Sequence, residues 1–267
     1  LRGAMWRNFQ IRYREINDIH KQMLATSDLV ATLAPADARR AAAVDHLQAG
    51  QSNDCYWHGL FGGIYLPDLR VAALSRLIAA EDLASGDGAP SGVLRDTDLD
   101  GRDEAVLAGP GQFVTVKLEE GGGIARWDLR AAAHPLAAVM RRRPEAYHDT
   151  LREHEAGDHG TGQAPESAEA TEGGAPASIH DIVLVKEAGL VDHLRYDAYE
   201  RRSGLIRILP AGTTADEATS GAADELGDLR DGTWTIDSID RERIVASRAG
   251  TIRTPDGPVP VRATRTI

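Results

Sequence analysis

Apolar residues in the first third of the chain recur every three or four positions, which is the spacing of one face of a helix. In the first such segment, residues 6–29, the repeating positions are Trp6, Phe9, Tyr13, Ile16, His20 and Met23. A second helix is predicted to begin near Pro35, because proline suits a first helical turn, and to end at Gly50. A third is predicted over residues 66–83. Three helices with short connections predict a small bundle.

Beyond a segment rich in Gly and Ser, the apolar pattern changes to every second residue, as in β-strands. The alternating segments are residues 112–118, 124–129, 204–209, 233–239, 243–247 and 259–266. Short strands separated by Gly, Asp and Pro predict an antiparallel β-sandwich rather than a parallel sheet. The expected architecture is therefore α+β and multidomain, with a three-helix bundle in residues 1–84, a linker at 85–92 and a β-sandwich in 93–267.

Residues 155–178 interrupt the alternating segments with Glu, Gly, Ala, Pro and Thr. This composition offers almost nothing to bury, so we expect a mobile insertion. Residues 213–227 are a weaker version of it, and residues 144–153 are predicted to be helical. The chain begins with Leu1 and ends in mid-alternation, so we expect a fragment of a longer protein with an incomplete sandwich.

Composition narrows the class of partner. The chain carries 41 acidic residues against 30 Lys and Arg, a net charge of −11, which disfavours nucleic acid. Its single cysteine, Cys55, excludes an internal disulfide and gives no reason to infer an oxidising compartment. No apolar run approaches the ~20 residues that span a bilayer, so a membrane partner is not expected. We therefore expect a cytoplasmic protein with a neutral substrate, whose oligomeric state is not predicted.

The segment between the second and third predicted helices, residues 51–67, places aromatic rings among glycines. Flat rings, polar edges and a backbone that can approach a ligand closely are typical of a sugar-binding surface. In that interpretation Tyr56 or Trp57 stacks on a hexose while Asn53, Asp54 and His58 bind hydroxyl groups. The alternative is that the rings fill the core and the glycines form a tight entry to the next helix. The residue types alone do not decide between the two.

A second candidate site is the acidic segment DTDLDGRDE, residues 96–104. The carboxylates of Asp96, Asp98, Asp100 and Glu104 supply the oxygen ligands that Ca²⁺ prefers, and Gly101 permits a sharp turn. The spacing differs from that of a helix-flanked calcium loop, so a loop between strands is expected. An Asp-rich turn without metal also fits. Any ion here is predicted to be structural rather than catalytic, because no His is present.

Several of these segments together resemble a known family. The ring-rich segment NDCYWHGLFGGIYLPDLR and the upstream WRNFQIRYREINDIHKQML are similar to the helical region of 4-α-glucanotransferases and α-amylases of glycoside hydrolase family 57. Downstream, DTDLDGRDE, GGGIARWDLR, RRRPEAYH and SIHDIVLVKE resemble the C-terminal β-sandwich of that family, in the same order.

The resemblance implies that the bundle closes one side of an active-site cleft and that Asn53, Asp54, Tyr56, Trp57, His58 and Gly59 line sugar subsites. It also implies an α-1,4-glucan or maltooligosaccharide substrate and a retaining mechanism with two carboxyl groups. Those carboxyl groups belong to a catalytic barrel that is expected to precede Leu1, so no residue of this chain is predicted to be catalytic. No cofactor is expected for the chemistry.

Three functions remain open from the sequence. The parent is expected to be a 4-α-glucanotransferase, of which this part alone is inactive. An α-amylase of the same family is the first alternative. A non-catalytic carbohydrate-binding protein, stabilised by calcium, is the second.

Overall fold

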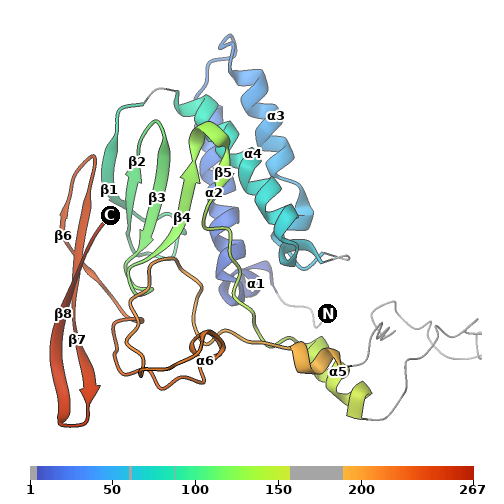
Figure 1. Ribbon diagram of the computed structural model, residues 1–267. Coiled ribbons are helices and arrows are strands. Elements are labelled where there is room, and N and C mark those ends of the chain that lie inside the picture. Colours follow the sequence, from blue (N-terminus) through green and yellow to red (C-terminus); the bar gives the residue numbers. More distant parts are fainter. Residues whose placement is uncertain (1–4, 60–61, 87, 157–188) are drawn as a thin grey trace, which may run out of the picture. The chain divides into compact units, whose positions relative to one another are not determined.

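The computed structural model describes residues 5–59, 62–86, 88–156 and 189–267 (Figure 1). The chain divides into two compact units. The first contains residues 1–140, 200–213 and 223–267, and the second contains 141–199 and 214–222. The helices of the predicted bundle and both β-sheets belong to the first unit. The segment 85–92 therefore separates helices from strands along the sequence without separating two compact units.

Four α-helices form the bundle, namely α1 (Trp6–Arg12), α2 (Arg14–Ala31), α3 (Arg40–Gly50) and α4 (Pro67–Ser85). The prediction of a single helix over residues 6–29 is wrong. Tyr13 leaves helical geometry, with φ −116° and ψ 85°, and so divides this segment into α1 and α2. The second predicted helix begins at Arg40 rather than near Pro35. Before it, the carboxylate of Asp37 accepts hydrogen bonds from the backbone and side chain of Arg39, which stabilises a turn in place of a helix.

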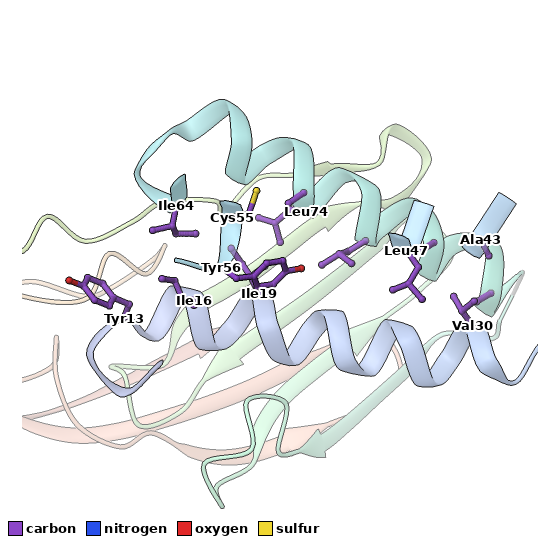
Figure 2. Close-up of a cluster of buried hydrophobic side chains, with 14 of the residues drawn as sticks. Tyr13, Ile16, Ile19, Val30, Ala43, Leu47, Cys55, Tyr56, Ile64 and Leu74 are labelled. Atoms are coloured by element: carbon purple, nitrogen blue, oxygen red, sulfur yellow. The ribbon is translucent and has the colours of Figure 1, made fainter. Parts of the chain in front are cut away.

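The core of the bundle is apolar and continuous from α2 to α4. Figure 2 shows Ile16, Ile19 and Val30 of α2 in one cluster with Leu47 of α3 and Leu74 of α4. Ile16 and Ile19 lie three apart on α2 and share one face with Val30, so the spacing of apolar residues correctly indicated a helix here. The predicted buried face is confirmed only in part, because Tyr13 and Ile16 are buried whereas Trp6 is 42% exposed. Burial of such apolar faces, rather than helix propensity, stabilises helices of this length.

The predicted β-sandwich is confirmed as two antiparallel sheets. The first, in the order β1-β2-β3-β4-β5, consists of β1 (Ser91–Arg95), β2 (Glu104–Ala108), β3 (Gln112–Lys117), β4 (Gly123–Leu129) and β5 (His134–Pro135). The second consists of β6 (Thr235–Ile239), β7 (Ile244–Thr254) and β8 (Gly257–Thr266). Ala105, Val114 and Val116 of the first sheet pack with Ile244 of the second. Within the first unit, helices and the second sheet cover opposite sides of the first sheet (Figure 1).

Two features of the sheets differ from the alternation of the sequence. Residues 204–209 were predicted to be a strand but form none, and only the preceding Ser203 makes an isolated bridge, to Ile124 of β4. Strand β1 begins inside the expected linker. The edge strand β8 pairs with β7 from Gly257 to Thr266 and includes Pro258 and Pro260.

The second unit is small. Helix α5 (Ala146–Ala156) confirms the helix expected at 144–153, and α6 (Ala215–Ser220) lies in the segment expected to resemble an insertion. Thr214 and Glu217 form a reciprocal capping box at the start of α6. The insertion expected at 155–178 lies almost entirely outside the described residues. Among the helices described, none has the length and apolar character that a membrane span requires.

Charged side chains join α2 to the first sheet. Lys117 of β3 is buried and pairs with Asp18 of α2 at 3.1 Å and with Asp98. Arg202 is paired with Asp18 at 2.9 Å and with Glu120 at 2.5 Å. Burial opposes ionisation of Asp18, but the positive charges of Arg202 and Lys117 lower the pKa of its carboxyl below the usual value. Asp18 is therefore ionised, whereas burial raises the pKa of Asp98. Arg14 pairs with Glu120 at 2.6 Å, so three cations face the three carboxylates of the group.

Replacing Arg202 by Met is expected to lower the free energy of unfolding by about 3 kcal/mol, because two buried carboxylates lose their shared cation. Urea unfolding at neutral pH measures the change. Arg241, whose side chain is 74% exposed, provides the control, for which Arg241→Met should change stability by less than about 0.5 kcal/mol. Equal effects of the two variants would contradict this account of the cluster.

Candidate functional site

The ring-rich segment lies between α3 and α4 and contains two short 3-10 helices, η1 (Asn53–Tyr56) and η2 (Gly63–Tyr65). Its residues divide into an inward and an outward set. Cys55 and Tyr56 are buried, whereas Asn53, Asp54 and Trp57 are exposed. Within η1 the first two residues are exposed and the last two are buried.

The burial of Tyr56 contradicts the interpretation in which its ring stacks on a hexose and fits the alternative that it fills the core. Its side chain is 8% exposed, and Figure 2 shows its ring directed toward α2, in the same cluster as Ile16 and Ile19. The hydroxyl donates a hydrogen bond of 2.6 Å to the carbonyl of Gly50, and burial raises the pKa of this phenol. Tyr56 is thus a core residue whose polar atom is satisfied by the backbone, which leaves it no face for stacking on a sugar.

Cys55 is also inward. Its Sγ donates to the carbonyl of Leu69 at 3.3 Å, and burial raises the pKa of the thiol. A raised pKa keeps the sulfur protonated and weakly nucleophilic. Cys55 is thus a packing residue rather than a nucleophile.

Among the aromatic residues of this segment that the structure describes, Trp57 is the most exposed, with 36% of its surface accessible. Its backbone is extended, with φ −154° and ψ −173°, so the chain leaves η1 at this residue. The carbonyl of Trp57 accepts a hydrogen bond of 2.9 Å from the amide of Ile64 in η2. The ring is therefore attached to a backbone position that is fixed on both sides of the turn.

His58 is half-buried in a group of aromatic rings. Its ring centroid lies 4.9 Å from Phe9, 5.0 Å from Tyr13 and 5.2 Å from Tyr65. Phe9 and Tyr13 meet it edge-on, and Tyr65 is stacked. These three partners were not predicted as site residues, although Phe9 and Tyr13 belong to the apolar stripe of the first helical segment. The orientation of His58 therefore depends on α1 and η2 as well as on its own segment.

Two glycines allow the segment to fold back on itself. Gly59 has φ +61° and Gly63 has φ +50°, a region that glycine enters without steric cost. A Cβ on Gly63 would lie 2.4 Å from the carbonyl oxygen of Trp57 and 2.4 Å from the carbonyl carbon of His58. The backbones of η2 and of the Trp57–His58 turn are thus in direct contact, which only glycine at position 63 permits.

Gly63→Ala is expected to lower the free energy of unfolding by about 2 kcal/mol or more, because it combines a left-handed backbone with a clash against main-chain atoms. Thermal or urea unfolding measures this change. Gly111→Ala is the control, since a Cβ there meets nothing within 4 Å. A Gly63→Ala protein as stable as the Gly111→Ala protein would contradict the close approach.

The acidic segment 96–104 is a compact loop between β1 and β2. Carboxylate oxygens of Asp96, Asp98 and Glu104 lie within 4.8 Å of one another, as do those of Asp100, Glu104 and Glu119. The four predicted ligands therefore gather around Glu104, but as two overlapping groups. Glu119, which follows β3, was not predicted because it is distant in sequence.

Glu104 is the centre of this loop. It is fully buried, and its Oε2 accepts hydrogen bonds from the amide and hydroxyl of Thr97 at 2.7 Å and 2.6 Å. Its Oε1 is buried with no hydrogen-bond partner among the residues that the structure describes. Burial raises the pKa of this carboxyl to about 7, although the Thr97 bonds and the charge of Lys117 act in the opposite direction.

The other carboxylates of the loop already accept hydrogen bonds or form ion pairs within the protein. Asp96 accepts from the amides of Asp100 and Gly101, at 3.2 Å and 2.9 Å, as in an Asp-rich turn. Asp98 pairs with Lys117. The geometry thus contains elements of both sequence interpretations, a turn held by its own side chains and a set of converging carboxylate oxygens.

Comparisons with known proteins agree with this arrangement of helices and sheets. Residues 4–84 match the family described as alpha-amylase/4-alpha-glucanotransferase, middle domain, and residues 96–264 match alpha-amylase/4-alpha-glucanotransferase, C-terminal. The protein is of the α+β class, with a helical bundle and a β-sandwich. The chain belongs to the alpha-amylase/4-alpha-glucanotransferase family.

Individual relatives are consistent with that assignment. Alpha-amylase 1 of Dictyoglomus thermophilum is 34% identical over 203 residues, 76% of this chain and 27% of the relative. The 4-alpha-glucanotransferase of Thermococcus kodakarensis is 32% identical over 253 residues, 94% of this chain and 35% of the relative. The crystal structure of 4-alpha-glucanotransferase from Thermococcus litoralis has a TM-score of 0.73 and 27% identity, covering 100% of this chain and 34% of that chain. The chain therefore spans roughly a third of the length of these relatives or less.

Proposed function

We propose that these residues form the non-barrel, substrate-binding part of an enzyme that processes α-1,4-glucans, and specifically of a 4-α-glucanotransferase. Relatives named 4-alpha-glucanotransferase and alpha-amylase support the class of activity. The observation that carries the proposal is the exposed ring of Trp57, which follows the exposed Asn53 and Asp54 in one short turn. A flat ring with amide and carboxylate groups nearby suits a hexose, which presents C–H faces and hydroxyl edges.

In this proposal the catalytic carboxyl groups belong to a barrel outside these residues. Two carboxyl groups ~5 Å apart would form and then resolve a covalent glycosyl-enzyme. The role of the present residues is to hold the glucan: Trp57 stacks on a glucose unit, and Asn53, Asp54 and the accessible edge of His58 bind its hydroxyl groups. Gly59 has no side chain, so the sugar can approach the backbone closely at this position. Tyr56 does not contact the sugar in this proposal; it is part of the core that supports the turn carrying Trp57.

The balance between transfer and hydrolysis follows from the same surface. A glycosyl-enzyme passes its sugar to another glucan when an acceptor occupies the cleft and excludes water, and to water when it does not. A stacking ring that retains the acceptor therefore favours the transferase over the α-amylase outcome. Both names occur among the relatives, so we treat the α-amylase as the alternative activity of the same site.

Trp57→Ala in the complete enzyme is expected to raise the KM for maltooligosaccharides about tenfold or more, because removal of one stacking ring costs roughly 1–3 kcal/mol in comparable base–aromatic contacts. The ratio of transfer to hydrolysis should also fall. Steady-state kinetics with product analysis measures both quantities.

Tyr147→Ala is the control, since Tyr147 of α5 is another exposed aromatic residue, 58% exposed, on a different element. Kinetics unchanged in Trp57→Ala would remove Trp57 from the substrate surface. A complete protein that binds maltooligosaccharide without turning it over would instead favour a non-catalytic binding function.

We also propose a structural calcium ion in the acidic loop. Asp96, Asp98 and Glu104 would hold it, with Asp100 or Glu119 completing the shell. The buried Oε1 of Glu104 supports this, because a buried oxygen without a hydrogen-bond donor is costly and a hard cation would satisfy it. An all-oxygen ligand set fits Ca²⁺ better than zinc. The ion would link β1, β2 and the turn after β3, and would take no part in the chemistry.

Calcium is expected to raise the melting temperature of the protein and EDTA to lower it, because a ligand that binds only the folded state stabilises that state. Glu104→Gln should abolish the calcium-dependent change in melting temperature. Asp103→Asn is the control, since this exposed acid of the same loop belongs to neither carboxylate group. A melting temperature that is indifferent to calcium in the unaltered protein would leave only the Asp-rich turn.

A further inference from the structure

A cavity of about 260 Å³ lies in the first unit between α2 and the strands β3 and β4. Asp18, Gln22 and Ala25 of α2 line one wall, and Phe113 and Thr115 of β3 line the other. The three positions on α2 are spaced four and three apart, so they lie on the same face of the helix. Asp96 and Asp98 of the acidic loop also line this cavity, whereas none of the described residues of the ring-rich segment does.

Two buried donors of the cavity lining are unsatisfied. Gln22 is 8% exposed, and its Nε2 makes no hydrogen bond within the described part of the chain. The same holds for Nη2 of Arg202, whose Nε and Nη1 are held by Glu120 and Asp18. Asp18 and Gln22 are one helical turn apart, so the two donors approach the cavity from neighbouring positions. Buried polar groups in native proteins are almost always paired, so a partner for both is expected.

The charged side chains that line the cavity sum to zero net charge. Six acidic and six basic side chains line it. The ion pairs of Lys117 with Asp18 and Asp98, and of Arg126 with Asp128, neutralise most of the buried ones. An ionic ligand would have to displace these pairs, whereas a neutral ligand with acceptor oxygens would satisfy the two free N–H groups without doing so. The electrostatics therefore select a neutral, acceptor-rich molecule.

The remaining lining is apolar, and the size is limited. Carbon surface comes from Phe113, Leu74, Leu24 and Val139, and the last two are 39% and 45% exposed. Ligand pockets usually measure roughly 300–1,000 Å³, so this cavity accommodates a single small ring rather than an extended chain. Apolar walls combined with a few convergent donors are the usual composition of a small-molecule site.

We propose that this helix–sheet cavity binds one neutral hexose unit, either free glucose or the terminal unit of a maltooligosaccharide. Hydroxyl oxygens would accept from Nε2 of Gln22 and Nη2 of Arg202, and the C–H faces of the ring would contact the apolar walls. The choice of a hexose among neutral polyhydroxyl compounds rests on the proposed function, whereas neutrality, size and the two donors come from the cavity. Binding here would stabilise the packing of α2 on the sheet.

The test is a glucose titration of the protein, followed by saturation-transfer NMR and by the change in melting temperature. Gln22→Leu is expected to weaken glucose binding about tenfold, because one buried hydrogen bond is lost. Its melting temperature without glucose should not fall, since an unsatisfied donor is replaced by an apolar group of similar size. Ala25→Phe, at an exposed position of the cavity lining, should block binding by filling the space.

Gln48→Leu on the exposed face of α3 is the matched control and should bind glucose normally. Glucose binding that depends on Trp57 and not on Gln22 would place the sugar at the ring-rich segment and overturn the cavity site, with the proposed function intact. Dependence on Gln22 but not on Trp57 supports the cavity site. If neither the unaltered protein nor any variant binds glucose, the cavity site is overturned and water fills the cavity. If glucose 6-phosphate binds more tightly than glucose, the inference that the ligand is neutral is overturned. Comparison of glucose with maltotriose identifies the free or the terminal unit.

Discussion

The arrangement of the first unit depends on a buried group of charges rather than on apolar contact alone. Lys117 lies between Asp18 and Asp98, and Arg202 lies between Asp18 and Glu120. Such a group gains little stability over an apolar equivalent, but it is satisfied in one relative placement of α2 and the sheet. Two other features depend on that placement. The acidic loop shares Asp98 with the group, and the cavity shares Asp18 and Arg202 with it.

Periodicity predicted the fold class and the position of most helices and strands, because a spacing of three or four residues and an alternation of two are local features of the sequence. It failed where tertiary contacts decide. The start of strand β1 was predicted to be a linker, because its residues are mostly exposed and show no alternation of apolar and polar positions. Residues 204–209 alternate, but Gly204 has φ +76° and the segment finds no neighbouring strand with which to form a ladder. The break at Tyr13 has no Gly or Pro to mark it.

The candidate sites could be located from sequence, but the role of each side chain could not. Composition and family resemblance identified residues 51–67, yet which rings turn inward is set by contacts with other elements. The hydroxyl of Tyr56 meets a carbonyl at the end of α3, and the ring of His58 meets α1. In the acidic loop, Glu119 joins Glu104 only because β2 and β3 are antiparallel neighbours. The two donors of the helix–sheet cavity have no sequence signature, since unsatisfied groups are recognisable only once their surroundings are known.

The edge strand β8 has a consequence for association between copies of the chain. An unpaired strand edge normally presents a regular row of N–H and C=O groups, to which a strand of another molecule can add. In β8, Pro258 and Pro260 stand at alternate positions, so they remove two donors from the same side of the strand. Prolines in sheets are confined to edges with the missing N–H directed outward. The long β7–β8 hairpin therefore carries its own protection against intermolecular sheet growth, in a protein whose second sheet would otherwise be a template for aggregation.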